Sequence, residues 1–443
     1  MTSPAGRTVL DRLLRPFSNV RPGEGLVALL MLVCIFLILT SYYVMKTARE
    51  GLILAGGAFG LRGDELKTYA TGAMALVFLA IVPTYGALAD RLRRIKLINL
   101  SYGVVIGCLL VFFALGQAGV PIGLPFFIWL GLTSVFLIAQ FWSYAADLYT
   151  EEQGKRLFAL IAIGGSAGAL VGPRLTDLAD THGLILIAAV ILVACVALFN
   201  AIERIHQRDD EANDYAVAPI AGEGGFALVL RDRYLLLIAA MLFGASLVNT
   251  TGEYILSNAV SEHAAAVIPA TAHAELSGMA RIDAITADRR ELIKGVYGDF
   301  FFWVNLVGFV LQAFVVSRLL QRLGVRRTLF VLPVIAFCAY GLIGGLGGLA
   351  VVRFAKIAEN ATEYSVQNTV RQTLFLPTSR VVKYKAKAAI DTFFVRSGDM
   401  LSAIVVGVGI HQLGFRGREL ALVNLGVILA WIAVAAGIAR RHR

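Results

Sequence analysis

The amino-acid sequence predicts an all-α membrane protein whose twelve transmembrane helices form two sets of six. Of the 443 residues, 58% are hydrophobic and only 16% are charged, and the mean hydropathy is +0.74. A soluble chain of this length carries more charge, so most of the surface of this protein is expected to face lipid. Apolar runs of about 20 residues, the length that spans a bilayer core, recur along the chain.

A polar stretch separates these apolar runs into two groups. The chain is therefore expected to consist of an N-terminal tail and six-helix half at residues 1–202, a cytoplasmic linker at 203–231, and a C-terminal six-helix half at 232–443. The predicted spans are 25–45, 68–89, 96–116, 122–146, 157–179, 184–202, 233–257, 294–316, 327–348, 350–374, 387–411 and 419–439.

The basic residues indicate the orientation of these helices. Most of the 40 Lys and Arg residues fall in segments on one side, among them the N-terminal tail, the linker and the C-terminal end. The positive-inside rule therefore predicts that both termini and the linker are cytoplasmic, and a bacterial inner membrane is the expected location. The same clustering accounts for the net charge of +10 without a nucleic-acid partner.

Neither a metal site nor a cofactor is predicted. The four Cys residues lie inside apolar runs without close pairs, so they indicate neither a disulfide framework nor a zinc site. Segment 258–293 is expected to be the one large loop on the outer side, and its His263 and His273 are a weak metal signal because they are far apart. The sequence has no nucleophile–base pair or cofactor motif that indicates an enzyme.

The tenth predicted span carries the densest group of polar residues. They recur at steps of three or four, which places them on one helical face, and Glu359 borders that face. Charge within a bilayer is costly, so this face either lines a water-filled pathway or forms structural ion pairs such as Lys356 with Glu359. The residues of the face are Arg353, Lys356, Asn360, Glu363, Tyr364, Gln367 and Arg371.

The first, seventh, eighth and eleventh spans also carry charged residues. In the eleventh span Arg396 and Asp399 are three residues apart and can neutralise each other. The first span ends in Lys46, Arg49 and Glu50, which either reach the membrane surface or form one lip of a pathway. Further charged or polar positions in the seventh, eighth and eleventh spans are Asn249, Glu253, Asp299 and Asp391.

Three glycines in the fifth predicted span indicate a close helix crossing. Gly164, Gly168 and Gly172 are spaced by four residues and therefore lie on one face. Small residues at this spacing let the backbones of two membrane helices approach closely.

The loop after the second span resembles a known signature. It reads Gly86-Ala-Leu-Ala-Asp90-Arg91-Leu-Arg93-Arg94, which is similar to the G-x-x-x-D-R-x-x-R/K motif of the major facilitator superfamily between helices 2 and 3. The corresponding loop of the second half, 317–327, is a weaker match. The resemblance implies a major facilitator-type fold with twelve helices.

Within that superfamily the chain resembles the ATP:ADP antiporters, the non-mitochondrial nucleotide translocases of plastids and intracellular bacteria. Five stretches carry this resemblance, and they occur in both halves in the order that the family has. They are Lys46-Thr-Ala-Arg49-Glu50 (family R-x-x-K-D), Glu65-Leu-Lys67-Thr-Tyr69 (F-L-K-T-Y), Thr150-Glu-Glu-Gln-Gly-Lys155-Arg156-Leu-Phe158 (T-x-E-E-A-K-R-F-Y), Tyr297-Gly-Asp299-Phe300 (G-D-F) and Lys383-Tyr-Lys385-Ala-Lys387-Ala-Ala-Ile-Asp391 (K-V-K-G-K-A-A-I-D).

Two stretches depart from the family pattern. Where the family has L-V-E-V-T-W-K, this chain has Leu247-Val-Asn249-Thr-Thr-Gly-Glu253, and Glu363 stands where the family motif S-K-Y-S has Lys. Two cationic positions are thus anionic here, which disfavours a substrate with several negative charges.

The resemblance implies three groups of site residues. Those expected to contact substrate are Lys46, Arg49, Lys67, Arg353, Lys356, Asn360, Tyr364 and Arg371. Those expected to pair with these cations or to carry a coupling proton are Glu50, Asn249, Glu253, Asp299, Glu359, Glu363, Asp391 and Arg396. Those expected to act in a cytoplasmic gate are Asp90, Arg91, Arg94, Glu151, Glu152 and Lys387.

The function that the resemblance implies is secondary transport by alternating access, with exchange of a small anionic metabolite such as ATP or ADP by a monomer in the lipid bilayer. One alternative is a proton-coupled transporter of a less charged or zwitterionic solute, which the acidic Glu253 and Glu363 favour. A second alternative is a membrane sensor that transports nothing.

Overall fold

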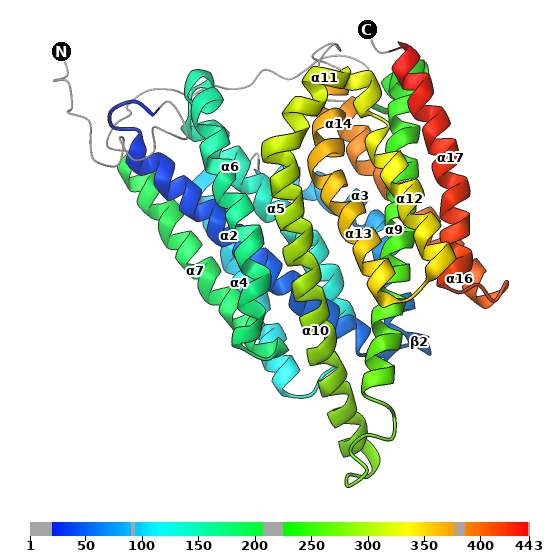
Figure 1. Cartoon of the computed structure of the whole chain (residues 1–443). Coiled ribbons are helices and arrows are strands. Elements are labelled where there is room, and N and C mark those ends of the chain that lie inside the picture. The colour runs from blue at the N-terminus through cyan, green and yellow to red at the C-terminus, as the bar shows by residue number, and fades with distance from the viewer. Residues whose placement is uncertain (1–19, 90–93, 207–224, 376–377, 379–385, 442–443) are drawn as a thin grey trace, which may run out of the picture. The chain divides into compact units, whose positions relative to one another are not determined.

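The computed structural model describes residues 20–89, 94–206, 225–375, 378 and 386–441, and nearly all of these residues are helical (Figure 1). The first helices are α2 (Gly25–Leu54), α3 (Gly63–Ala89), α4 (Arg94–Gln117), α5 (Gly123–Leu148), α6 (Glu151–Arg174) followed by the 3₁₀ helix η1 (Leu175–Leu178), and α7 (Thr181–His206).

The remaining helices include several π-helical segments. In chain order they are α8 (Gly225–Arg231), α9 (Arg233–Val267), α10 (Gly278–Val310), the π-helix η2 (Leu311–Val315), α11 (Val316–Thr328), α12 (Val331–Leu346), α13 (Leu349–Thr362), the π-helix η3 (Glu363–Gln367), α14 (Asn368–Leu374), α15 (Lys387–Ala389), the π-helix η5 (Ile390–Phe394), α16 (Val395–His411) and α17 (Gly417–Arg441).

A short hairpin joins α2 to α3. Strands β1 (Gly57–Ala58) and β2 (Leu61–Arg62) pair antiparallel. The two residues between them, Phe59 and Gly60, have φ of 56° and 75°. A two-residue loop with positive φ at both positions matches the right-handed twist of the strands, so the chain reverses direction within a few residues.

Each of the twelve predicted spans falls on helical residues to within a few positions. In the described part of the chain, eight helices are long and apolar enough to cross a membrane, and the 16-residue α12 is a shorter apolar helix. The stretch from α13 to α14 carries the charged residues of the tenth span, which lower its hydropathy. The protein is therefore an all-α, multi-pass membrane protein.

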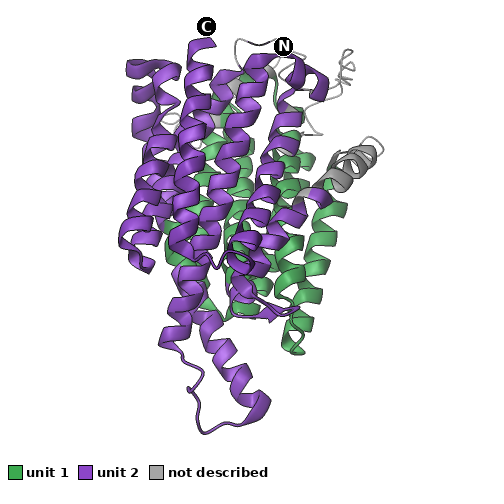
Figure 2. Cartoon of the chain, turned by 90° about the vertical axis from the view of Figure 1, so that its right-hand side faces the viewer, with its two compact units in different colours: residues 1–50, 83–216, 297–302 green, residues 51–82, 217–296, 303–443 purple. Residues whose placement is uncertain are grey.

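The structure contains two compact units (Figure 2). Unit 1 consists of residues 1–50, 83–216 and 297–302, and unit 2 consists of residues 51–82, 217–296 and 303–443. The units follow packing rather than chain order, since most of α3 belongs to unit 2. The division into halves at 1–202 and 232–443 stays a prediction.

The glycines of α6 in unit 1 lie against α2, as their spacing predicts. A Cβ atom added at Gly164 would lie 2.3 Å from the carbonyl oxygen of Leu32, and one added at Gly168 would lie 2.2 Å from that of Phe36. Hydrogen in place of a side chain therefore allows the two backbones to touch.

Gly168→Ala is expected to destabilise the protein by about 1–3 kcal/mol, because the new methyl group overlaps a backbone carbonyl and forces α2 and α6 apart. Thermal unfolding of the purified protein measures the loss. Gly103→Ala in α4 is the matched control, since nothing lies within 4 Å of its Cβ position. Equal melting temperatures for both variants would show that the crossing tolerates separation.

In unit 2, α9 is the central helix. It packs against α13, α16 and α17, and α12 packs against α13 and α17. The start of α9 and the end of α17 lie at one end of the unit, and the turn between α9 and α10 lies at the opposite end (Figure 1).

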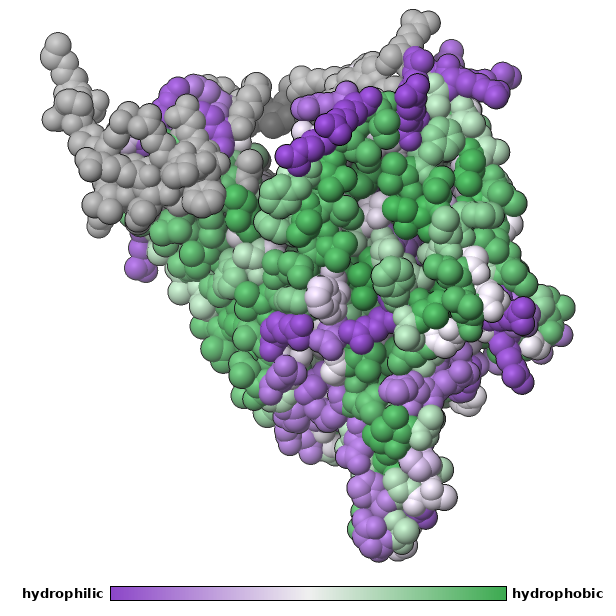
Figure 3. Space-filling view, viewed as in Figure 1, coloured by the Kyte–Doolittle hydropathy of each residue, from purple (hydrophilic) through white to green (hydrophobic). Residues whose placement is uncertain are grey.

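The expectation of a large loop at 258–293 is wrong. Helix α9 continues to Val267 and α10 begins at Gly278, so only residues 268–277 join them. These extensions are polar and project from unit 2 as a hydrophilic tip (Figure 3). The fall in hydropathy marks where the chain leaves the bilayer, not where the helix ends. The extensions beyond that point are rich in Ala, which favours helix, so α9 and α10 continue outside the bilayer.

His273 in this tip forms hydrogen bonds with two carboxylates. Its Nε2 lies 2.7 Å from Asp288 and its Nδ1 lies 3.3 Å from Glu275. The hydrogen bond with Asp288 raises the pKa of this exposed imidazole above its ordinary value. Among the residues that the structure describes, no group of three or more His, Cys, Asp or Glu could hold a metal ion.

Candidate functional site

A buried network of charges lies at the centre of unit 2. Lys356 on α13 is fully buried, and its Nζ donates hydrogen bonds of 2.8 Å to both Glu359 and the side chain of Asn249 on α9. The carboxylate of Glu253 lies 3.9 Å from the same Nζ. The ion pair between Lys356 and Glu359 that the sequence suggested is therefore present, together with two partners on a different helix.

Tyr340 on α12 completes the environment of Glu359. The Tyr340 hydroxyl lies 3.1 Å from Glu359 Oε2 and can donate to it. Room for both groups comes from Gly252 on α9, where a Cβ would lie 1.9 Å from the Tyr340 hydroxyl and 2.9 Å from Lys356 Nζ. Neither Tyr340 nor Gly252 is charged, so the pattern of charges in the predicted spans does not indicate them.

Glu253 connects this network to a second lysine. Lys67 on α3 is 6% exposed, donates a 2.9 Å hydrogen bond to Ser257, and lies 3.6 Å from the other oxygen of Glu253. Asn360 donates a 3.1 Å hydrogen bond to the Glu253 oxygen that faces Lys356. One carboxylate thus lies between two lysines, so the acidic residue at this position compensates cations instead of standing alone.

The start of α3 makes further polar contacts with α9 and α16. Asp64, which is 1% exposed, accepts a 2.9 Å hydrogen bond from Asn258, and Glu65 lies 3.6 Å from His411. These contacts fix the end of α3 that presents Lys67, so the position of that lysine depends on side chains outside the charged network.

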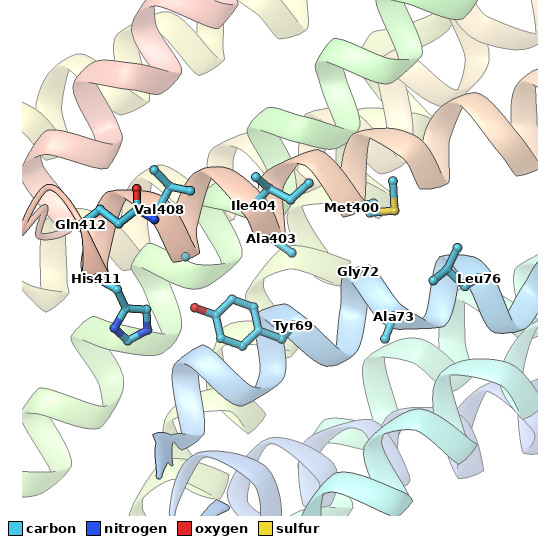
Figure 4. Close-up of a pocket in the computed structure, with 11 residues that line it drawn as sticks. Tyr69, Gly72, Ala73, Leu76, Met400, Ala403, Ile404, Val408, His411 and Gln412 are labelled. Atoms are coloured by element: carbon cyan, nitrogen blue, oxygen red, sulfur yellow. The ribbon is translucent and has the colours of Figure 1, made fainter. Parts of the chain in front are cut away.

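An apolar groove of about 460 Å³ runs between α3 and α16 beside these contacts (Figure 4). Tyr69 from α3 and Met400 from α16 are among its lining residues, and His411 lies at one end. The helices touch closely at Gly72, where a Cβ would lie 2.9 Å from that of Ala403. With so few polar atoms, the groove is a poor site for an anion.

A second cavity in unit 2, of about 510 Å³, is lined by polar and charged side chains. It lies between α9, the segment from η3 to α14, and α16. Several of these residues belong to the face predicted for the tenth span, Asn368 lies beside that face, and the others come from the seventh and eleventh spans. The lining residues are Leu242, Ala245, Ser246, Asn249, Glu363, Tyr364, Gln367, Asn368, Arg371, Val395, Arg396 and Asp399.

Asp399 is the best-satisfied charge in this cavity. It accepts hydrogen bonds of 2.5 Å from Ser246, 2.7 Å from Thr250 and 3.0 Å from Arg396. The pairing of Arg396 with Asp399 confirms that these residues neutralise each other. At the other end of the lining, Arg371 forms an ion pair with Asp391, which the sequence analysis did not anticipate because twenty positions separate the two residues.

The tenth span does not keep one continuous α-helical face. The π-helix η3 adds a residue to the turn at Glu363–Gln367, so the residues before and after it are rotated relative to a regular α-helix. Lys356 is fully buried, whereas Tyr364 is 45% exposed and lines the cavity. Arg353, near the start of α13, is half-buried and does not line this cavity. A spacing rule based on 3.6 residues per turn cannot detect this interruption.

In unit 1, Lys46 lies among aromatic rings. Its Nζ is 4.2 Å from the centre of the Phe301 ring, 5.3 Å from that of Tyr43 and 5.9 Å from that of Tyr42. Within the described parts of the chain no carboxylate lies within ion-pair distance of Lys46. Aromatic faces attract an ammonium group without neutralising it, so the charge of Lys46 remains available to an anion.

The other charges near the end of the first span are paired. Arg49 forms an ion pair with the adjacent Glu50, and its guanidinium lies 4.4 Å from the Phe127 ring centre. Glu50, which is 1% exposed, therefore compensates the charge of Arg49. Arg174 pairs with Asp299 at 2.8 Å, which explains why α10 carries an acid at this position.

The predicted gate residues are described only in part. Asp90 and Arg91 lie outside the described residues, and the side chains of Arg94 and Glu151 are not described. Glu152 pairs with Arg21, and Lys387 donates to Gln372 of α14.

The motif around Thr150 also stabilises the start of α6. Thr150 and Gln153 form a reciprocal capping box, and Arg156 pairs with Glu24 at 2.9 Å. Burial raises the pKa of Glu24, but hydrogen bonds from Arg156, the Arg21 backbone and Gln153, together with the charge of Arg156, outweigh burial and hold that pKa below its ordinary value. This stabilisation is therefore lost as the pH falls through the lowered pKa.

Comparison with known proteins shows similarity to nucleotide carriers, although no protein-family model matches the chain. The ADP,ATP carrier protein 1 of Chlamydia trachomatis is 23% identical over 349 residues, which are 68% of this chain and 62% of the carrier. The same-named protein of Chlamydia pneumoniae is 22% identical over 350 residues, with 68% and 64% covered. The chain therefore matches less than two thirds of the length of these relatives.

Solved structures show the fold. The nucleoside transporter NupG superposes with a TM-score of 0.63 at 15% identity and covers 92% of this chain and 98% of its own. A bacterial homologue of the iron transporter ferroportin, in an inward-facing state, gives 0.61 at 12% identity, with 93% and 98% covered. These relatives and neighbours are carriers and transporters, not enzymes. By sequence the chain is thus similar to bacterial ADP,ATP carriers, and by fold it is a multi-pass membrane protein of the major facilitator type.

Proposed function

We propose that this protein is a secondary transporter that works by alternating access and exchanges an anionic metabolite, with ATP and ADP as the substrates. The observation that carries the proposal is Lys46, a half-buried cation held by aromatic rings with no carboxylate of the described residues within ion-pair distance. A cation in this state forms strong, charge-assisted hydrogen bonds with a phosphate. Similarity to ADP,ATP carriers supports nucleotides as the anion.

The buried network in unit 2 has a different part in this proposal. Lys67 and Lys356 are balanced by Glu253 and Glu359, so the network adds no net charge. It therefore holds α3, α9 and α13 in register and positions groups near the cavity. A phosphate that approached Lys356 would have to displace two carboxylates.

The protein is proposed to act as a monomer in a bacterial inner membrane, with both termini in the cytoplasm. The geometry of unit 2 is compatible with this orientation, because the start of α9 and the end of α17 lie at one end and the α9–α10 turn at the other. A cysteine introduced at Glu275 should react with an impermeant thiol reagent added to intact cells. Reaction only after the cells are opened would show that the α9–α10 turn is cytoplasmic, which contradicts the proposed orientation.

Counterflow in proteoliposomes tests the exchange. Vesicles loaded with ADP should take up labelled ATP, and empty vesicles should not, because an exchanger returns to its starting state only with substrate bound. A pH gradient should have little effect. Uptake into unloaded vesicles that requires no internal nucleotide would reject the exchange proposal.

One observation favours the proton-coupled alternative. Glu363 lines the cavity, and its buried Oε2 has no hydrogen-bond partner among the described residues. A carboxylate in such a place can bind a coupling proton. If this alternative holds, an inward proton gradient drives uptake of a solute into empty vesicles, and Glu363→Gln abolishes that uptake. Exchange that continues in Glu363→Gln excludes it.

A further inference from the structure

The polar cavity of unit 2 has hydrogen-bonding capacity that the protein does not use. Oε2 of Glu363 and Oε1 of Gln367 are both buried and accept no hydrogen bond within the described residues. Gln367 is 4% exposed, so solvent at the molecular surface does not satisfy its carbonyl. A buried acceptor without a donor costs free energy, which a ligand with N–H groups can recover.

The cations of the same cavity are already matched. Arg371 pairs with Asp391, and Arg396 pairs with Asp399. Within the described part of the chain, Glu363 is therefore the charged lining residue that lacks an ion-pair partner. The region around Glu363 and Gln367 consequently attracts a hydrogen-bond donor and repels an oxyanion.

An unused donor lies farther along the same helix. Nε of Arg371 is buried and has no acceptor in the described residues. Glu363, Gln367 and Arg371 follow one another at steps of four residues, so Gln367 lies midway between the acid and this arginine. The cavity thus offers two buried acceptors, Glu363 and Gln367, followed along the chain by the donor of Arg371, an order that suits a ligand with a donor group and an anionic group.

We propose that this cavity binds the base end of an adenine nucleotide, with Glu363 and Gln367 accepting from the exocyclic amino group and Arg371 Nε directed toward the phosphates. This inference rests on the proposed function, because it takes a nucleotide as the substrate. A volume of about 510 Å³ is within the range of small-molecule sites. The acid at position 363 is thus a determinant of base specificity rather than an obstacle to phosphate.

ADP and IDP form the matched pair of ligands for the test. IDP has a carbonyl oxygen where ADP has the amino group, so it places an acceptor against two acceptors. Wild-type protein is expected to bind ADP at least about tenfold more tightly than IDP, since buried polar groups of a site reject an analogue that leaves them unpaired. Equilibrium binding of both nucleotides to the purified protein gives this ratio.

Variants assign the discrimination to these residues. Glu363→Leu and Gln367→Leu should each lower the ADP/IDP ratio toward one, whereas Glu363→Gln should retain most of it because its amide oxygen still accepts from a neutral amino group. Glu275→Gln, an exposed acid in the hydrophilic tip, is the control and should leave the ratio unchanged. Thermal unfolding identifies any variant that is misfolded. If one leucine variant is misfolded, the ADP/IDP ratio of the other leucine variant tests the inference.

Several outcomes would overturn the inference. Equal affinity for ADP and IDP in wild type would do so, as would discrimination that survives in both leucine variants. If Glu363→Gln lowered the ADP/IDP affinity ratio as much as Glu363→Leu does, the site would require a negative charge and would suit a protonated amine instead of an adenine. These results differ from failure of the proposed function, in which folded wild-type protein exchanges no nucleotide in the vesicle assay.

Discussion

Replacing Lys356 with methionine is expected to lower the free energy of unfolding by about 3–5 kcal/mol, because it leaves a buried carboxylate without its cation. Lys356 is fully buried, and Glu359 beside it is 3% exposed. Methionine fills much of the volume of lysine, so the loss reports the missing charge rather than a cavity. Thermal or denaturant unfolding of the purified protein in detergent measures the effect.

A second substitution tests whether the pair is the cause. Glu359→Gln alone should also destabilise the protein, but Lys356→Met combined with Glu359→Gln should recover part of the loss, since no unpaired charge of this pair remains. Lys96→Met, at an exposed position of α4, is the control for loss of a lysine. Additive losses in the double variant would show that Lys356 and Glu359 act independently, contrary to their 2.8 Å contact.

Lys46→Met is expected to have the opposite profile, with a large loss of nucleotide affinity and little change in stability. Removing a cation that contacts a phosphate in a shielded site costs about 2–5 kcal/mol, which corresponds to at least about a 30-fold weaker affinity. No carboxylate in the described residues is left unpaired by this substitution, because Lys46 contacts aromatic rings instead.

The measurement is ADP binding by Lys46→Met and by Lys46→Arg, which keeps the charge. The arginine variant should retain most of the affinity, since a guanidinium also packs on aromatic faces and binds phosphate. Melting temperatures of both variants should stay close to that of the wild type. Unchanged ADP affinity in a folded Lys46→Met protein would remove Lys46 from the binding site and with it the observation that carries the proposed function.

The sequence by itself determined the membrane character and the helix positions of this protein. Composition and apolar run length respond to the bilayer directly, so the twelve spans fall on helices to within a few residues. The crossing of α6 with α2 followed from the spacing of Gly164, Gly168 and Gly172, because close approach of two backbones requires small residues at that interval. The pairs Lys356–Glu359 and Arg396–Asp399 were also evident, since a separation of three residues on a helix brings side chains together.

Only the tertiary structure decided which charged side chains form ion pairs and which polar atoms have no partner among the described residues. Glu253 lies between Lys67 and Lys356 because α3, α9 and α13 meet there, and Arg371 pairs with Asp391 because α14 meets η5. The π-helix at Glu363–Gln367 rotates the tenth span, which no periodicity rule anticipates. The free acceptors of Glu363 and Gln367, and the aromatic surroundings of Lys46, depend on side chains that meet only in the folded protein, because hydrogen bonds and ion pairs are decided by distance in space.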